Sequence, residues 1–175
     1  SVTIPNSVTN IREGTFYGCS GLTSITIGSG VTSIDNYAFT YCSKLSVIYN
    51  FATKIPTSSF GDNSNAFEKT PIEDVTLYVP ASLIEQYKAK IPWYRFGTIA
   101  PLDYIDGIYY NFTDDEAEVT YRDESYNSYS GNVIIPTFVT SVWGNTYTVK
   151  SVGDHAFLNC KIARSEERFS RNAAT

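Results

Sequence analysis

The strongest constraint on the fold of this chain is an internal repeat of 23 residues in its first half. Six apolar columns coincide without a gap when the sequence is shifted by 23 positions. The columns pair Ile4 with Ile27, Val8 with Val31, Ile11 with Ile34, Phe16 with Phe39, Cys19 with Cys42 and Leu22 with Leu45. Self-similarity at one fixed period is the sequence signature of repeat architectures, so we expect similar units stacked on one another.

Each unit predicts one strand, a turn and a return path. Ile25 and Ile27 alternate with polar neighbours, which is the period of a β-strand. Gly28 and Gly30 mark a turn, and Val31 begins the return path. Because one unit cannot bury its own apolar side, neighbouring units must stack, with equivalent strands about 4.8 Å apart. We therefore predict a β-rich solenoid with coils of about 23 residues.

The pattern weakens after residue 46 and then returns. Residues 47–75 follow it poorly, although Ala66 and Phe67 repeat the Ala-Phe pair of the earlier units. A strand phrase returns at residues 77–80. This phrase indicates that the first array continues through the irregular stretch.

A short capping helix is predicted after this phrase. Ser82 and Glu85 match the capping-box pattern, and Pro92 is expected to end the helix. Its apolar side would comprise Leu83, Ile84 and Tyr87. We expect this helix to close the first array, since the end coils of solenoids need caps.

The sequence changes character from residue 103. Residues 106–112 and 117–123 predict two strands joined by a polar turn, and residues 132–135 resume the strand phrase. An inserted β-hairpin is predicted from residues 141–143 and 146–152, with Gly144 and Asn145 as its turn. After it, Val152 and residues 156–160 align again with the repeat, which predicts the start of a second array.

These patterns predict three parts of the chain. Residues 1–100 would form the repeat array with its closing helix, and residues 101–160 the hairpin segment and the start of a second array. Residues 161–175 leave every pattern, and residues 164–173 resemble the in-frame translation of a sequencing-library adapter. We expect a truncated gene and a non-native tail here; the alternative is a genuine basic tail.

The unit I-x-I-P-x-x-V-x-x-I-x-x-x-A-F-x-x-C-x-x-L resembles the BspA-like leucine-rich repeat family. Residues 1–46 and 132–160 match it most strongly, and residues 76–96 resemble a segment that closes such arrays. The resemblance implies right-handed coils of the leucine-rich-repeat kind. It also implies a cell-surface or secreted protein of bacteria or parasitic protists, associated with adhesion to host proteins and to other cells.

Charge and composition argue against several other functions. The net charge is −5 without a basic stripe, so we expect no nucleic acid as partner and no anionic membrane. No apolar run approaches the roughly 20 residues of a membrane span. No nucleophile signature accompanies the one histidine, His155, which is predicted to be an exposed loop residue. We therefore expect neither an enzyme nor a cofactor, and the oligomeric state is left open.

The three cysteines, Cys19, Cys42 and Cys160, are the obvious candidates for chemistry. They are separated by 23 and 118 residues, whereas zinc sites use closely spaced pairs, so no metal is expected. A Cys19–Cys42 disulfide would be within reach between adjacent coils. Free cysteine is among the most buried residue types, which favours a reduced, buried column. The acidic residues Asp114, Asp115, Glu116 and Glu118 are interpreted as a solvated hairpin tip and not as a calcium loop.

The candidate binding site lies on the outward positions of the predicted strands. Tyrosine offers large, stiff, amphipathic contact area for a protein or a glycan, while the alternative is that tyrosine and threonine are simply good strand formers. We predict a non-catalytic adhesion module that recognises a host or cell-surface protein or glycan; the alternative function is a structural spacer. The predicted column comprises Thr3, Thr26, Tyr49 and Tyr78, flanked by Ser24 and Val47.

Overall fold

In the computed structural model the chain forms two compact units, Ser1–Tyr104 and a second that begins at Ile105. Apart from Lys161–Ile162, the predicted non-native tail lies outside the described residues. The structure describes residues 1–58, 60–61, 64–113, 116–121 and 128–162.

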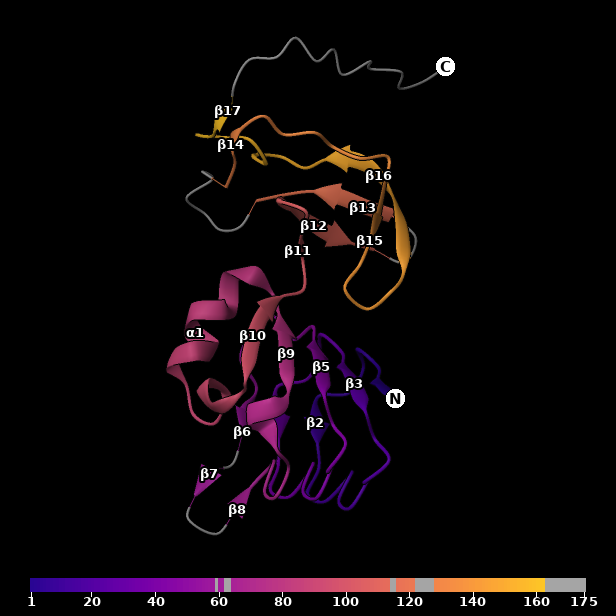
Figure 1. The fold of residues 1–175 in the computed structure, drawn as a ribbon, viewed down its shortest axis with the longest axis vertical. Helices are drawn as coiled ribbons and strands as arrows, with labels where there is room; N and C mark the ends of the chain where they lie inside the picture. The colour runs from indigo at the N-terminus through magenta and orange to yellow at the C-terminus, as the bar shows by residue number, and fades with distance from the viewer. Residues whose placement is uncertain (59, 62–63, 114–115, 122–127, 163–175) are drawn as a thin grey trace. The chain divides into compact units, whose positions relative to one another are not determined.

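The first unit is built on a sheet of five parallel strands in the order β1-β3-β5-β9-β10 (Figure 1). Its register pairs Ile4 with Ile27 and Ile25 with Ile48, so the strand pairing predicted from the 23-residue shift is confirmed. The last strand, β10, was not predicted. The strands are β1 (Val2–Ile4), β3 (Ser24–Ile27), β5 (Val47–Asn50), β9 (Thr76–Val79) and β10 (Thr98–Pro101).

The return paths of the repeats form a second, shorter parallel sheet. It contains β2 (Asn10–Ile11), β4 (Ser33–Ile34) and β6 (Thr57–Ser58), in that order. Ile11 and Ile34 pair with each other and are buried, which explains why the repeat keeps an apolar residue at this column. A two-stranded antiparallel sheet, β7 (Phe60–Gly61) with β8 (Ser64–Asn65), follows β6.

A stack of phenylalanine rings fills the space between these sheets. The ring centroids of Phe16 and Phe39 are 5.3 Å apart, and those of Phe39 and Phe67 are 5.2 Å apart, with nearly parallel planes. The Ala-Phe pair of the irregular stretch is therefore in the repeat column, as the sequence predicts. At its far end Phe67 meets the rings of Trp93 and Phe96 edge-on, and these end the stack.

The predicted helix is present but begins differently. It comprises the 3₁₀ turn η2 (Ala81–Leu83) and α1 (Ile84–Ala89), and the 3₁₀ turn η3 (Trp93–Arg95) follows. The predicted capping box is wrong, because the N-cap residues are Pro80 for η2 and Leu83 for α1, and neither makes a side-chain capping hydrogen bond. The carboxylate of Asp103 accepts a hydrogen bond from the backbone N–H of Ala81 at 2.8 Å and meets the need for a cap from a distant position.

The apolar side of this helix packs as predicted. Tyr87 is fully buried, and Leu83 and Ile84 lie partly buried against the core of the first unit. Together with Trp93 and Phe96, the helix covers the end of the phenylalanine stack. No helix in the described part of the chain has the length and apolar content to cross a membrane.

The repeat turn places two residues in the left-handed backbone region. One column holds Gly14, Tyr37 and His155, with φ of 64°, 57° and 65°. The second unit therefore forms the same local turn, with hydrogen bonds from Ala156 N to Gly153 O and from Leu158 N to His155 O. Residues 155–159 thus share the turn geometry of the repeats, while the start of a second array stays a prediction. The other column holds Gly18, Tyr41, Lys69 and Asn159, with φ of 69°, 59°, 55° and 56°.

The second unit contains a five-stranded mixed sheet in the order β11-β12-β13-β16-β15. The predicted strand pair is confirmed as antiparallel β12 and β13, and β13 also pairs in parallel with β16. The strands of this unit are β11 (Tyr104–Ile105), β12 (Ile108–Phe112), β13 (Glu116–Val119), β14 (Ser130–Gly131), β15 (Phe138–Thr140), β16 (Thr146–Val152) and β17 (Lys161–Ile162).

Two predictions for this unit need correction. The inserted hairpin exists, but its first strand is β15 and not residues 141–143, because Ser141 and Asn145 close the turn and Trp143 packs against Phe112. Residues 132–135 do not form a strand. Their counterparts in the first unit pair with the strand of the next repeat, whereas here the β15–β16 hairpin follows in the chain.

Candidate functional site

The register of the first sheet brings all four predicted site residues into one row. Thr3 pairs with Thr26, Thr26 with Tyr49 and Tyr49 with Tyr78. Exposed or half-buried positions alternate with buried ones along these strands, so the row faces away from the core. These four residues are called the Thr–Tyr row below. Ala100 continues the row on β10.

The two tyrosines of the row form an ordered pair. Their ring centroids are 5.3 Å apart and the ring planes differ by 21°, which matches the spacing of neighbouring strands. Burial raises the pKa of Tyr49 above its ordinary value, and the neighbouring Tyr78 raises it further. The hydroxyl of Tyr49 therefore keeps its proton to a higher pH than an ordinary tyrosine does.

A second outward row lies beside the first. It consists of Ser24, Val47, Thr76 and Thr98 in consecutive strands. None of the residues in the five strands is charged, so the two outward rows offer hydroxyl groups, two aromatic rings and the apolar side chains of Val47 and Ala100. Thr76, Thr98 and Ala100 were not predicted from the sequence. The phrase T-I-A-P at β10, which is close to T-I-P at residues 3–5, was the signal that could have found the last two.

The cysteine column has a structural role in the first unit. Cys42 is fully buried, and its Sγ donates a hydrogen bond to the carbonyl oxygen of Phe16 at 3.3 Å. Cys19 and Cys160 are only partly buried, so the predicted burial is correct for Cys42 and wrong for the other two. Cys19 lies at the open end of the stack, where its neighbour Phe16 is also only partly buried. All three residues are free thiols.

Thr70 occupies the cysteine column in the third repeat of the first unit. Its hydroxyl donates to the carbonyl of Phe39 and accepts a hydrogen bond from the backbone N–H of Cys42 at 3.0 Å. Burial raises the pKa of Cys42 to about 11, with a smaller contribution from Cys19, so the thiol remains a hydrogen-bond donor at neutral pH. Both side chains thus donate to the phenylalanine carbonyl of the preceding repeat.

The other polar residues singled out in the sequence, where the structure describes them, do not gather into a catalytic arrangement. His155 is exposed on the left-handed turn of the second unit. Glu118 accepts hydrogen bonds from Asn111 and from Ser151, both at 3.2 Å, on the outer side of its sheet. Asp114 and Asp115 lie outside the described residues. In the described ranges, no group of three or more His, Cys, Asp or Glu residues is placed to hold a metal ion.

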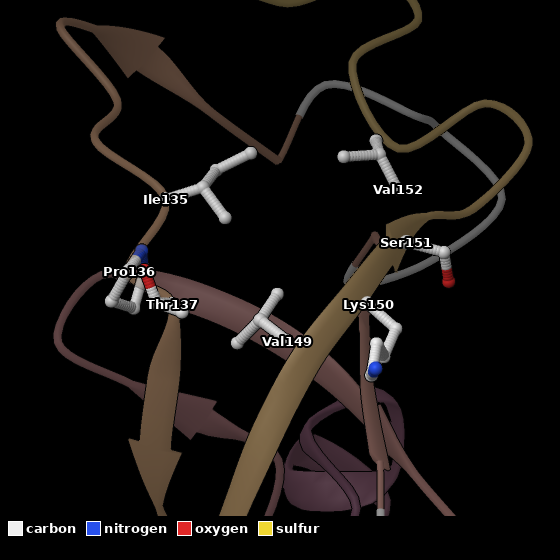
Figure 2. Close-up of a pocket in the computed structure, with 7 residues that line it drawn as sticks. All are labelled: Ile135, Pro136, Thr137, Val149, Lys150, Ser151 and Val152. Atoms are coloured by element: carbon white, nitrogen blue, oxygen red, sulfur yellow. The ribbon is translucent and has the colours of Figure 1, made fainter. Parts of the chain in front are cut away.

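The second unit also contains a hollow of about 300 Å³ with a mixed apolar and polar lining (Figure 2). The strand register shifts between Ala117 and Glu118, which makes Lys150 the extra residue of a bulge in β16. Val149 and Val152 therefore lie on the same side, and Ile135 faces Val152 across the hollow in Figure 2. Its lining residues are Ile135, Pro136, Thr137, Val149, Lys150, Ser151 and Val152.

Comparison with known families shows which protein family the chain belongs to. The sequence model described as "BspA type Leucine rich repeat region (6 copies)" matches residues 1–88, about half of the 175 residues. The chain belongs to this family. The BspA-type match includes β1, β3, β5 and β9, and with them the whole Thr–Tyr row. It does not extend to residues 132–160.

No curated protein and no solved structure matched the chain in the same comparisons. The family resemblance stated from the repeat phrase is confirmed by the BspA-type match. Leucine-rich repeats are in general a non-catalytic binding fold whose stacked units present an extended surface. The strand-rich first unit with its one short helix fits a repeat β fold of this kind.

Proposed function

We propose that this BspA-type chain is a non-catalytic adhesion module that works at a cell surface or in a secreted protein. Its partner would be a host or cell-surface protein or glycan, bound on the outer face of the five-stranded sheet. The observation that carries this proposal is the register that gathers Thr3, Thr26, Tyr49 and Tyr78 into one uncharged row.

Physical features of the Thr–Tyr row support a binding role. The sheet faces of stacked repeats form extended binding surfaces. Tyrosine rings supply a large contact area at a low cost in conformational entropy. Because Tyr49 and Tyr78 already stack on each other, a partner would need to immobilise little more of either ring.

We further propose the architecture in which this surface sits. Residues 1–100 would form a right-handed solenoid that the α1 segment closes, and residues 101–160 would hold the hairpin segment and the start of a second array. The parallel register at the 23-residue shift and the continuous phenylalanine stack support the solenoid. The similarity of residues 164–173 to an adapter translation supports a non-native tail.

The decisive experiment compares two tyrosine pairs of the first unit. The double variant Tyr49→Ala/Tyr78→Ala removes the stacked rings of the Thr–Tyr row. The control variant Tyr17→Ala/Tyr41→Ala removes an exposed edge-to-face pair whose ring centroids are 5.6 Å apart and which lies outside that sheet. Binding to immobilised extracellular-matrix proteins and to a glycan array would be measured by biolayer interferometry and fluorescence.

We expect the Tyr49/Tyr78 variant to bind at least about tenfold more weakly, which corresponds to about 1.4 kcal/mol, while the control binds normally. Equal binding by both variants would show that the outer face is not the binding surface. A chain that binds no protein or glycan would instead favour the structural spacer.

A further inference from the structure

We propose that the ligand of the Thr–Tyr row is a neutral glycan, with a sugar ring seated over Thr26 and Thr3 against the tyrosine stack. This inference rests on the proposed function, because it names the chemical class that the outer face would bind. It also assigns a position to the ligand, beside the face of the Tyr49 ring that is turned toward β3 and away from Tyr78.

The first argument is the geometry of the row. Tyr78 and Tyr49 form successive rungs 5.3 Å apart, and the next rungs of the same row are Thr26 and Thr3. Each strand adds about 4.8 Å, a spacing close to that of stacked flat groups. Because threonine is much shorter than tyrosine, the two tyrosine rings stand higher above the sheet than the two threonines beside them. Thr3 and Thr26 are called the floor of the row. A flat ligand ring over that floor would continue the stack.

The second argument is the absence of charge. None of the residues in β1, β3, β5, β9 and β10 is charged, although the chain has 31 Asp, Glu, Lys and Arg residues, from 13 basic and 18 acidic. A charged ligand on this face would lose hydration without gaining a counter-charge. The outer face therefore favours a neutral ligand over sialylated, sulfated or strongly basic ones.

The third argument is the chemistry of the floor. Thr3 and Thr26 carry hydroxyl groups, and Ser24 adds a third beside them on β3. Hydroxyls both donate and accept hydrogen bonds, as do the hydroxyls of a sugar. A pyranose ring also has an apolar C–H face, which suits an aromatic ring. Aromatic and hydroxyl groups without any charge therefore match a neutral sugar better than a protein segment, which generally brings charged side chains.

The test adds a bulky side chain at a threonine of the row, whereas the Tyr49/Tyr78 variant removes the two rings. Thr26→Tyr would add a third ring to the stack and occupy the position assigned to the sugar. Cross-strand aromatic neighbours stabilise sheets, so this variant is expected to fold. Thr53→Tyr is the matched control, because Thr53 is an exposed threonine of the same unit outside the sheet. Circular dichroism would verify that both variants fold.

Binding of the full chain would be measured by isothermal titration calorimetry and saturation-transfer NMR. The neutral probes are hexasaccharides of glucose, mannose and N-acetylglucosamine, and the charged probes are sialyllactose and a heparin hexasaccharide. We expect at least one neutral hexasaccharide to bind, Thr26→Tyr to weaken that binding at least about tenfold, and Thr53→Tyr to leave it unchanged.

The outcomes separate this inference from the proposed function. Equal binding by Thr26→Tyr and the wild type, a preference for the charged probes, or no binding of any neutral probe at millimolar concentration would overturn the glycan inference. If a host protein binds in a Tyr49- and Tyr78-dependent manner while no neutral glycan binds, the glycan inference fails and the proposed function stands. Glycan binding that is weakened neither by Thr26→Tyr nor by Tyr49→Ala/Tyr78→Ala would refute both the glycan inference and the proposed function.

Discussion

Cys42 and Thr70 occupy the same place in successive repeats and make the same kind of hydrogen bond. Each is a small side chain that donates to the phenylalanine carbonyl of the preceding repeat. This column of the repeat therefore requires a small hydrogen-bond donor, and both a cysteine thiol and a threonine hydroxyl meet that requirement. This explains a rare cysteine without any metal or redox chemistry.

The donor explanation predicts different effects for two substitutions of Cys42. Cys42→Ala removes the donor and leaves a small void, so we expect it to lower the free energy of unfolding by about 1–2 kcal/mol. Cys42→Thr keeps a donor, as Thr70 does, and should cost clearly less. Urea unfolding followed by circular dichroism measures both. Equal losses for the two variants would contradict the donor role.

The same thiol predicts a dependence of stability on alkaline pH. The pKa of Cys42 is raised by burial from 9.0 to about 11, so the folded protein binds the proton more tightly than the unfolded chain. This contribution is fully present below pH 9 and is lost as the pH rises toward 11, with a slope of up to about 1.4 kcal/mol per pH unit.

Urea midpoints at pH 8 and pH 10.5 would measure this loss, with Cys42→Thr as the control that retains every tyrosine. The wild type should lose more stability than the variant between the two pH values. Parallel losses would show that the Cys42 thiol does not titrate as inferred.

The left-handed turn column predicts a stabilising substitution. Lys69 is exposed with φ of 55°, a conformation that costs non-glycine residues about 1–2 kcal/mol. Lys69→Gly should therefore raise the free energy of unfolding by roughly 0.5–1 kcal/mol, after the greater freedom of glycine in the unfolded chain is taken into account. Lys69→Ala keeps a Cβ and should give no such gain. Differential scanning calorimetry would compare them.

At the scale of elements, a buried polar contact attaches α1 to the sheet. The side-chain amide of Asn50 in β5 donates to the hydroxyl of Tyr87 in α1 at 2.9 Å, and both residues are fully buried. Burial also raises the pKa of Tyr87. The oxygen of the same Asn50 side chain accepts from Ala52 N, so this one residue fixes both the chain after β5 and the position of the helix.

Tyr87→Phe is predicted to loosen this attachment. It would leave a buried N–H of Asn50 without its acceptor, at a cost of about 1–2 kcal/mol in the free energy of unfolding. Tyr94→Phe is the matched control, because Tyr94 follows in the adjacent 3₁₀ turn and is 53% exposed. Chemical denaturation should separate the two variants, and equal stabilities would show that the Asn50–Tyr87 contact is unimportant.

The elements that the sequence predicted well are those with a local period. The alternation around Ile25 and Ile27 and the 23-residue shift were sufficient for the strands and for their register. The cap of the helix was missed because Asp103, which supplies it, is 22 residues away from Ala81. The strand at 98–101 was missed although its phrase T-I-A-P resembles T-I-P at residues 3–5. The strands of the second sheet are only two residues long, which is too short for an alternating pattern of their own.

The candidate site, too, was predictable from the sequence only in part. The 23-residue period places Thr3, Thr26 and Tyr49 in one row. Tyr78 is 29 residues after Tyr49 and was placed in the row because residues 77–80 resemble residues 2–5. Coordinates were needed for the stacking of the two rings, since side-chain rotamers do not follow from spacing. They were also needed for Ala100, which joins the row only because β10 pairs with β9.

At the scale of the whole molecule, the two compact units predict independent folding of the first one. Its sheet, phenylalanine stack and helix are assembled from residues 1–104 alone. A chain that ends at Tyr104 should therefore unfold cooperatively and keep the binding properties of its outer face. Thermal unfolding and the same glycan titrations would check this. A non-cooperative transition would show that the first unit depends on residues beyond Tyr104.

The step between repeats is not constant in this chain, and that has an evolutionary consequence. Phe39 and Phe67 are 28 residues apart, five more than Phe16 and Phe39, yet their rings stack at almost the same distance. The longer repeat contains β7 and β8, and β5 still pairs in register with β9. Mutation and selection can therefore lengthen or rewrite this loop while the sheet keeps its spacing. If the chain works at a cell surface as proposed, its epitopes could vary there while the proposed binding face is kept.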